Sequence, residues 1–504
     1  MRRSLRTADS RTTRSERRAP GMSRTMWIDV SDLLHYLTHH NRPSGIQRVV
    51  FELSRALAAQ APSQVRFVQR TGGPCHFETV DWSYLAALFS TVTGVSSRQQ
   101  TSPAATPEKR IDTFIESPET ETTLPAVFRT QLNVLRHLAR LPRETVRYGL
   151  RKAEIHRTAR LKREAIAAET GKITPPDRRI RLADAAKPGD VFFVPGSPWH
   201  HLDYVRTVRW LRDDLRMSFG LLIHDLIPVR HPEWCDRGVI VTFTQWHRSI
   251  LPLADHVFVT SRHVAGDVEA YAAENGIVFD NPVTPVGLGS SFGAAVPQSA
   301  KAPSPSLPDE ARAGTLPAST SPASENYVLF VSTLEARKNH SLLFRVWRRL
   351  LEERPADQVP VLVFAGRVGW LVSDLMQQLD NANWLDGKIR LVSSPTDDEL
   401  ATLYRGCLFT LFPSLSEGWG LPVAESLAFG RPCIASNTTA IPEAGGSLVK
   451  YFDPEDTDSA TRAIGAVIDD REGLAAWQKT VATRYTPASW DGPAKRVLAG
   501  YGLS

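Results

Sequence analysis

The chain has 504 residues, of which 42% are hydrophobic and 23% charged, a composition typical of a globular protein long enough for two or more domains. No apolar run reaches the roughly 18–20 residues of a transmembrane helix, and the four cysteines lack CxxC or metal-ligand spacing, so we expect a reducing compartment and no structural metal. The net charge of +6 fits an anionic ligand or surface, but no nucleic-acid-binding motif accompanies it, so no nucleic-acid partner is expected.

Residues 1–24 form a basic tail that is rich in Arg, Ser and Thr and poor in apolar groups. No apolar segment follows its arginines, so the tail lacks the pattern of a secretory signal peptide. Such a composition cannot bury enough apolar surface to fold, and we expect disorder. Met1 and Met22 are both candidates for the true start.

The first predicted unit is a strand at 26–30, a loop that ends at Gly45 and an amphipathic helix at 46–60. Strand, glycine-containing loop and helix form the first unit of a doubly wound α/β domain. Gly45 either only allows the turn or brings the backbone close to a ligand, and both interpretations stay open. A second strand is expected at 64–69.

Residues 96–187 interrupt the alternation of strands and helices. The first third is polar and rich in Pro and Thr, whereas residues 126–170 have helical periodicity and many Lys and Arg side chains. We interpret this stretch as a helical insertion in an N-terminal domain of residues 25–293. Its basic helices have either a solvated face or a surface that makes peripheral contact with a membrane.

Alternation resumes after residue 189, which predicts a parallel sheet covered by helices on both faces. In such a sheet, ligands bind beyond the carboxyl ends of the strands. His224 directly follows a predicted strand, so it either points into a cleft or is hydrogen-bonded to a loop backbone. Strands are expected at 191–194, 219–224, 256–260 and 282–286, with helices near 204–215 and 239–251 and after 261.

A stretch rich in Pro, Ala and Ser, residues 294–325, is predicted to be a flexible linker to a second domain at 326–484. There, a strand is followed by Arg337 and Lys338 and then by a helix. Two cations between a strand end and a helix start suit a diphosphate, although exposed surface cations are the common alternative. Further strands are expected at 361–365, with Arg367 after it, and at 389–392, with a helix that starts near 396.

Most of the chemistry is expected where a strand runs into a glycine-rich turn and then into a helix that starts at Leu421. Two carboxylates, Glu417 in the turn and Glu425 in the helix, are separated by seven residues. The helix start offers free N–H groups and a positive dipole end to an anion, and Gly418 and Gly420 permit close approach. For either glutamate alone, the alternative is an exposed charge near a helix start.

The segment EGWGLPVAE at 417–425 resembles the E-x7-E motif of retaining, GT-B-fold glycosyltransferases of family 4. The resemblance implies an α/β GT-B fold, with two Rossmann-like domains facing a central cleft and a last segment, residues 485–504, that crosses back as a helix onto the first domain. Further segments similar to this family are SGIQRV at 44–49, HDLIP at 224–228, TLEARKN at 333–339, GRPCIAS at 430–436 and IPEAGG at 441–446.

The resemblance implies transfer of a hexose from a nucleotide-sugar with retention of configuration and without a metal or other cofactor. Glu417 would hold sugar hydroxyls and Glu425 the ribose diol, while Lys338 and Arg337 would neutralise the diphosphate. The chain departs from the pattern at residues 332–333, Ser-Thr where many relatives carry Gly-Arg, so Arg337 would have to supply the second cation. The remaining residues that the resemblance places at the donor are His224, Gly418, Trp419, Gly420, Leu421, Arg367, Val392 and Gly45.

The resemblance also implies partners: GDP-mannose or a UDP-hexose as donor, and a glycan or lipid-linked acceptor of bacterial surface-polysaccharide synthesis. The expected location is the cytoplasm, with peripheral attachment to the inner face of the cytoplasmic membrane left open. Competing functions are a GT-B-fold nucleotide-sugar epimerase or phosphorylase, and a catalytically silent assembly protein that binds nucleotide-sugars. The presence of Glu417, Glu425 and Lys338 argues against a silent protein.

Overall fold

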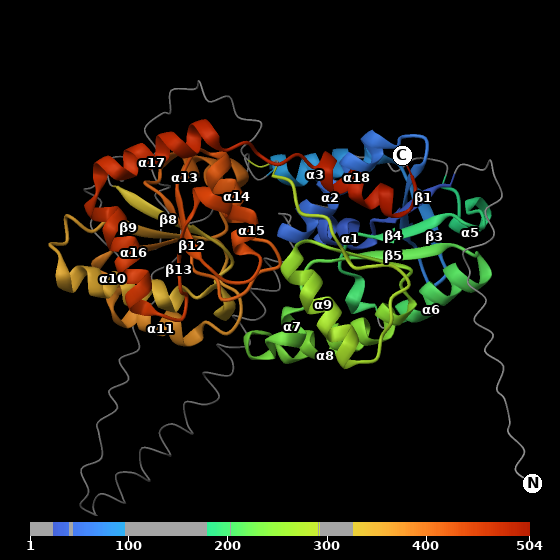
Figure 1. Cartoon of the computed structure of the whole chain (residues 1–504), viewed down its shortest axis with the longest axis horizontal. Coiled ribbons are helices and arrows are strands. Elements are labelled where there is room, and N and C mark those ends of the chain that lie inside the picture. The colour runs from blue at the N-terminus through green and yellow to red at the C-terminus, as the bar shows by residue number, and fades with distance from the viewer. Residues whose placement is uncertain are drawn as a thin grey trace, which may run out of the picture.

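The computed structural model describes residues 24–39, 44–95, 179–201, 203–290, 292 and 326–503. These residues form two α/β domains that lie side by side, each built on its own sheet (Figure 1). The predicted fold class, two Rossmann-like domains, is confirmed. The predicted basic tail up to residue 23, the helices expected at 126–170 and the whole predicted linker at 294–325 lie outside the described residues.

The N-terminal sheet has the strand order β3-β2-β1-β4-β5-β6-β7. Neighbouring strands are parallel except for β3, which pairs antiparallel with β2. Side chains of β1 alternate between two apolar cores, with Met26 and Ile28 on one face and Trp27 on the other. The strands are β1 (Met26–Asp29), β2 (Val65–Arg70), β3 (Phe77–Val80), β4 (Val191–Val194), β5 (Ser218–Ile223), β6 (His256–Val259) and β7 (Thr284–Pro285).

Helices cover both faces of this sheet: α1, α2 and α3 share the core of Met26, and α6, α8 and α9 share the core of Trp27. Because both faces are buried, a central strand such as β4 is apolar at every position. The helices of this domain are α1 (Ser31–His39), α2 (Gly45–Gln60), α3 (Trp82–Val95), α5 (Leu182–Ala185), α6 (Tyr204–Arg209), α7 (Ile227–Arg230), α8 (Arg237–Ile250) and α9 (Arg262–Glu274).

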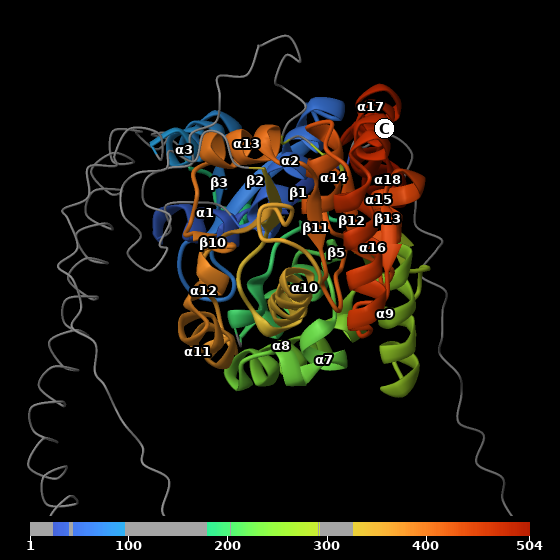
Figure 2. The same cartoon turned by 90° about the vertical axis from the view of Figure 1, so that its left-hand side faces the viewer.

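The C-terminal sheet is parallel throughout, in the order β10-β9-β8-β11-β12-β13. Its strands are β8 (Tyr327–Val331), β9 (Val361–Ala365), β10 (Ile389–Val392), β11 (Thr410–Phe412), β12 (Cys433–Ser436) and β13 (Lys450–Phe452). Its helices are α10 (His340–Glu353), α11 (Ser373–Asn381), α12 (Asn383–Asp386), α13 (Asp397–Gly406), α14 (Leu421–Ala428), α15 (Ile441–Gly445), α16 (Thr457–Asp469) and α17 (Arg471–Arg484). Figure 2 views the molecule from the side of the C-terminal domain and shows α10 and α16 there.

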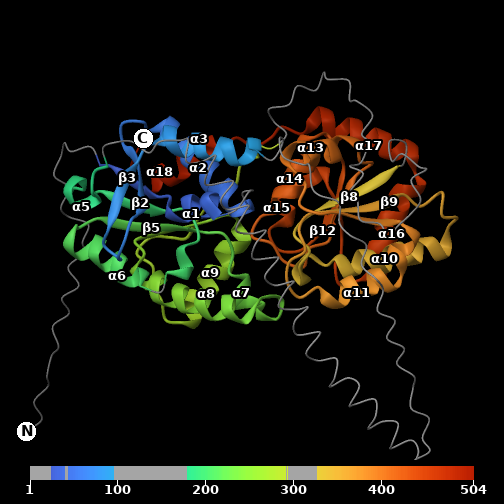
Figure 3. The same ribbon diagram turned by 180° about the vertical axis from the view of Figure 1, so that it is seen from behind.

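The last helix, α18 (Asp491–Gly500), leaves the C-terminal domain and packs on the N-terminal one (Figures 1 and 3). Its side chains Ala494, Val497 and Leu498 are buried in the same core as β1 and α2. The N-terminal domain is therefore completed by the chain's last described helix, and the two domains are joined by this helix as well as by the stretch after β7.

The structure contains elements that the sequence pattern did not predict. The expected loop before Gly45 contains α1, which buries Leu33, Leu34 and Leu37 directly after β1. The parallel sheet predicted from the alternation after residue 189 is confirmed for β4 to β7. The strand β3, which the sequence pattern did not predict, runs antiparallel to β2 at the edge of this sheet. Among the described residues, no helix has the length and apolar character needed to cross a membrane.

Candidate active site

Glu417 lies in the turn after β11, and its carboxylate is held by two cations. Lys338 Nζ lies 2.5 Å from Oε1, and Arg337 Nη1 lies 2.8 Å from Oε2. Arg337 also donates to the backbone oxygen of Ser416 at 2.6 Å and forms an ion pair with the buried Glu335 at 2.6 Å. The predicted pair of cations therefore points inward and fixes the turn, which contradicts the alternative of exposed surface charges.

The charges of this cluster determine the protonation of Glu417. Burial alone would raise the pKa of its carboxyl group, but Arg337 and Lys338 lower it to about 2. Burial lowers the pKa of Lys338, and the neighbouring Arg337 lowers it further. At neutral pH, Glu417 is thus a fixed carboxylate that accepts hydrogen bonds and holds no proton to donate.

Gly418 brings the turn into contact with the N-terminal domain. A Cβ atom at this position would lie 2.0 Å from the backbone oxygen of His224, so only glycine fits. The hydroxyl of Thr260 lies 2.8 Å from the backbone oxygens of both His224 and Gly418 and can donate to either. The end of β5 and the turn after β11 therefore meet across the domain boundary.

His224 directly follows β5, and its Nε2 donates to the backbone oxygen of Pro195 at 2.9 Å. Burial lowers the pKa of the imidazole, which keeps it neutral with its hydrogen on Nε2. The interpretation of a ring hydrogen-bonded to a loop backbone is thus confirmed, and a contact of His224 with the donor sugar stays a proposal. Nδ1 is left as an unprotonated acceptor.

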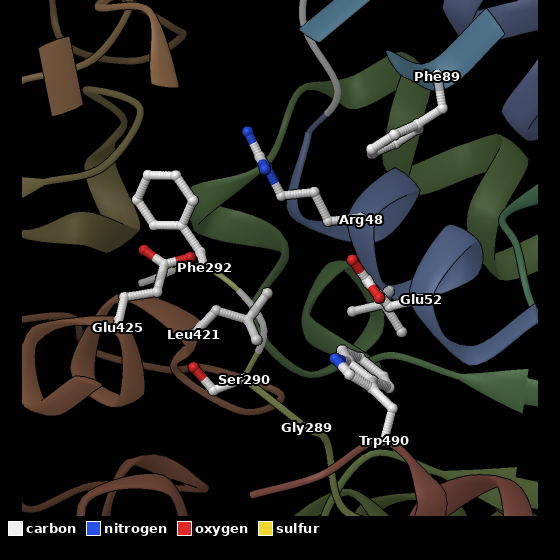
Figure 4. Close-up of a pocket in the computed structure, with 10 residues that line it drawn as sticks. Arg48, Glu52, Phe89, Gly289, Ser290, Phe292, Leu421, Glu425 and Trp490 are labelled. Atoms are coloured by element: carbon white, nitrogen blue, oxygen red, sulfur yellow. The ribbon is translucent and has the colours of Figure 1, made fainter. Parts of the chain in front are cut away.

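Glu425 lies in α14 and lines a pocket between the domains (Figure 4). Tyr404 donates to its Oε2 at 3.0 Å. Burial raises the pKa of Glu425, while Arg48 and the hydroxyl of Tyr404 counteract this effect. The residues that line the pocket are Arg48, Val49, Glu52, Phe89, Gly289, Ser290, Phe292, Leu421, Glu425 and Trp490.

The start of α14 faces the start of α2. A Cβ atom on Gly45 would lie 3.7 Å from Leu421 Cδ1, and Gly420 has a φ of +110°, a left-handed conformation that suits glycine. Trp419 packs against the N-terminal core. The N-termini of two helices thus lie close together, and the positive ends of their dipoles favour an anion.

Arg367 and Val392 lie farther along the same edge of the C-terminal sheet, after β9 and at the end of β10. The backbone oxygen of Val392 already accepts a hydrogen bond from Gly366 N–H at 3.0 Å. Burial raises the pKa of Tyr36 in α1, and Arg367 counteracts this effect from the opposite domain. The structure thus places Arg367 facing the N-terminal domain, and the predicted contact of both residues with a nucleobase stays a proposal.

Several residues of the site were missed by sequence reasoning although they lie within the segments quoted above. Arg48 belongs to SGIQRV, and Glu335 belongs to TLEARKN. Glu443 of IPEAGG accepts hydrogen bonds from the backbone N–H groups of Arg262 and His263 at 3.0 Å each, so it caps α9 of the opposite domain. These residues lie within segments that resemble the family, but the spacing of residues along the chain does not reveal a partner in another domain.

In the described part of the chain, no group of His, Cys, Asp or Glu side chains has the arrangement of a metal site.

Comparison with known proteins identifies the C-terminal domain. Residues 315–484 match the family described as glycosyl transferases group 1. A serotype-specific mannosyltransferase, WbdA, of Escherichia coli is 28% identical over 270 residues, which cover 53% of this chain and 31% of that protein. O-antigen chain mannosyltransferase B of E. coli is 30% identical over 182 residues, covering 36% of this chain and 46% of that protein.

A further relative is the D-inositol 3-phosphate glycosyltransferase of Thermobifida fusca, which is 33% identical over 187 residues, or 34% of this chain and 42% of that protein. Among solved structures, the sucrose-phosphate synthase of Thermosynechococcus elongatus aligns over 94% of both chains with 18% identity and a TM-score of 0.48. The chain spans about a third to a half of the length of the curated relatives named here. The chain is therefore similar to the glycosyl transferases group 1 over residues 315–484.

Proposed function

We propose that the protein is a retaining glycosyltransferase that moves a hexose from a nucleoside-diphosphate sugar to a glycan or lipid-linked acceptor of surface-polysaccharide synthesis. The observation that carries this proposal is the buried carboxylate of Glu417, held by Arg337 and Lys338 in the turn that opens α14. The named mannosyltransferase relatives favour a mannose donor, so GDP-mannose is the first candidate and a UDP-hexose the second.

The proposed donor position follows from the charges and from the helix starts. The diphosphate binds at the N-terminus of α14, near Lys338 and facing Gly45, where the helix dipole stabilises negative charge. Glu425 accepts hydrogen bonds from the ribose diol, and the ionised Glu417 accepts them from sugar hydroxyls. His224 contacts the sugar, and Arg367 and Val392 lie toward the nucleobase.

In the proposed reaction, an acceptor hydroxyl oxygen bonds to the anomeric carbon while the bond from that carbon to the diphosphate oxygen breaks. The hydroxyl proton passes to the departing phosphate oxygen on the same face, which retains the configuration. Glu417 is not the base, because Arg337 and Lys338 stabilise its charged form and lower its pKa to about 2. The protein's contribution is to orient the donor and to stabilise the leaving group.

The proposal is tested by calorimetric titration of the purified chain with GDP, UDP, ADP and dTDP, and then by incubation with the matching nucleotide-sugar in EDTA. We expect one diphosphate to bind, and nucleoside diphosphate to be released faster when a glycan acceptor is added. Release without a new glycosidic product, or interconversion of the sugar itself, would instead indicate an epimerase or a hydrolase. Failure of every nucleotide to bind would overturn the proposal.

A further inference from the structure

Arg48 extends from α2 of the N-terminal domain into the pocket that Glu425 lines (Figure 4). Its Nη2 lies 2.5 Å from Asp397 Oδ1, at the start of α13 in the opposite domain, and its guanidinium carbon lies 5.4 Å from the centre of the Phe292 ring. Arg48 is one helical turn beyond Gly45, which faces Leu421. The guanidinium therefore shares a pocket with Leu421 at the start of α14 and with Glu425, the two places assigned above to diphosphate and ribose.

Binding of a diphosphate in the active site requires a cation beyond Arg337 and Lys338. Arg337 and Lys338 are each paired with Glu417, and Arg337 is also paired with Glu335. These two carboxylates offset both cations before a donor arrives. A nucleoside diphosphate adds negative charge at the same place, and oxygens of phosphate groups are bound most strongly by charge-assisted hydrogen bonds.

Arg48 can supply that charge because its present ion pair with Asp397 is partly exposed to solvent. The side chains of Arg48 and Asp397 are 25% and 29% exposed, and pairs in contact with solvent contribute little. Asp397 also lies in the first turn of α13, where the helix dipole stabilises its carboxylate. A capping box formed by Thr396 and Glu399 holds that helix start, so α13 does not depend on Arg48.

We propose that Arg48 is a donor-binding residue that the N-terminal domain contributes across the cleft, and that it exchanges Asp397 for the diphosphate of the nucleotide. This inference rests on the proposed function. Asp397 then competes with the ligand for the guanidinium, so removing its charge favours binding. The planar guanidinium suits two phosphate oxygens at once, which an ammonium group does not match.

The test is a double-mutant cycle in which the dissociation constant of the nucleoside diphosphate is measured by calorimetry, with GDP, UDP, ADP and dTDP as probes. Arg48→Ala should weaken binding about tenfold or more, the effect of losing a charge-assisted hydrogen bond. Asp397→Asn should tighten binding about two- to fivefold, as expected for release of an exposed ion pair. In the double variant, Asp397→Asn should add nothing, because the residue that it frees is absent.

Two further variants serve as controls. Asp458→Asn is matched to Asp397→Asn, because Asp458 lies in the first turn of α16 and also pairs with an arginine, Arg349. It should leave the dissociation constant unchanged. Arg48→Lys keeps the charge and should bind with an affinity between those of the wild type and Arg48→Ala. Equal thermal unfolding midpoints would show that all variants are folded.

The outcomes separate this inference from the proposed function. If Arg48→Ala and Asp397→Asn both weaken binding equally, the pair is only a strap between the domains and Arg48 does not bind the donor. If the wild type binds a nucleotide and neither variant changes the affinity, the inference fails while the proposed function stands. If neither the wild type nor Asp397→Asn binds any of the four nucleotides, both proposals fail.

Discussion

The carboxylate of Glu417 is shared between Lys338 and Arg337, and this sharing limits what the residue can do. Its pKa of about 2 keeps it charged at neutral pH. A group of this kind can orient hydroxyls and position cations, but it cannot deliver a proton. The second glutamate of the motif differs, because burial raises the pKa of Glu425 and its strongest opposing charge comes from Arg48 of the other domain.

Replacing Lys338 by Ala should lower the turnover number of sugar transfer about 100- to 1,000-fold, the effect of removing a preorganised charge from a transition state. The fold should remain, since Glu417 keeps its ion pair with Arg337. The measurement is the initial rate of product formation at saturating donor. Lys479→Ala, which removes an exposed lysine of α17, is the control and should keep the wild-type rate. Full activity of Lys338→Ala would show that this cation has no part in transfer.

Replacing Glu425 by Ala should weaken binding of the nucleoside diphosphate by about 1–3 kcal/mol, because the ribose diol loses a charged acceptor. Calorimetric titration measures the change directly. Glu472→Ala, on the exposed first turn of α17, is the matched control. An unchanged dissociation constant in Glu425→Ala would remove this residue from the donor site.

At the scale of elements, the turn between β11 and α14 is shaped by contact with the other domain as much as by its own sequence. Gly418 lies against the backbone oxygen of His224, and the hydroxyl of Thr260 lies within hydrogen-bonding distance of both residues. Glu443 at α15 caps α9 in the same region. The elements that hold the site therefore also join the two domains, so we expect domain closure and catalysis to be coupled.

Gly418→Ala should strongly reduce transfer, because the new methyl group would lie 2.0 Å from a backbone oxygen and would push the turn away from β5. Small-angle scattering should show a larger radius of gyration, while circular dichroism should show unchanged helix content.

Gly266→Ala is the control, since a Cβ there meets nothing within 4 Å. That substitution lies within α9 and should stabilise the protein by about 0.5–1 kcal/mol. Wild-type activity in Gly418→Ala would contradict the described contact.

The molecule as a whole is held together by α18, which follows the C-terminal domain in the chain but completes the N-terminal core. Figure 3 shows this helix beside α2 and α3. Leu498→Ala should therefore lower the free energy of unfolding of the N-terminal domain by about 2–5 kcal/mol, as for other buried leucines. Urea titration should show an earlier transition for that domain alone. Loss of stability confined to the C-terminal domain would contradict this assignment.

Periodicity predicted most of the regular elements because both faces of each sheet are buried. Strands such as β4 and β9 are short apolar runs, and α2 and α10 bury one face at helical spacing, so local sequence suffices to find them. β3 was missed because it has four residues and lies between polar side chains, and α1 was missed because it follows β1 almost directly. Antiparallel pairing of β3 also depends on β2, which local spacing does not reveal.

The sequence by itself determined the fold class and the candidate residues of the active site. Glycine-containing turns, helix starts and the charged residues beside them can be recognised from residues that are adjacent in the sequence. Tertiary structure alone decided which of these residues meet. Arg337 and Lys338 converge on Glu417, about 80 residues later in the chain, because parallel strands β8 and β11 end at the same edge of one sheet. Arg48 reaches Asp397 and the pocket of Glu425 only because the two domains pack against each other, with α18 of the C-terminal end buried in the N-terminal core. Such contacts depend on long-range packing, which no local pattern of residues contains.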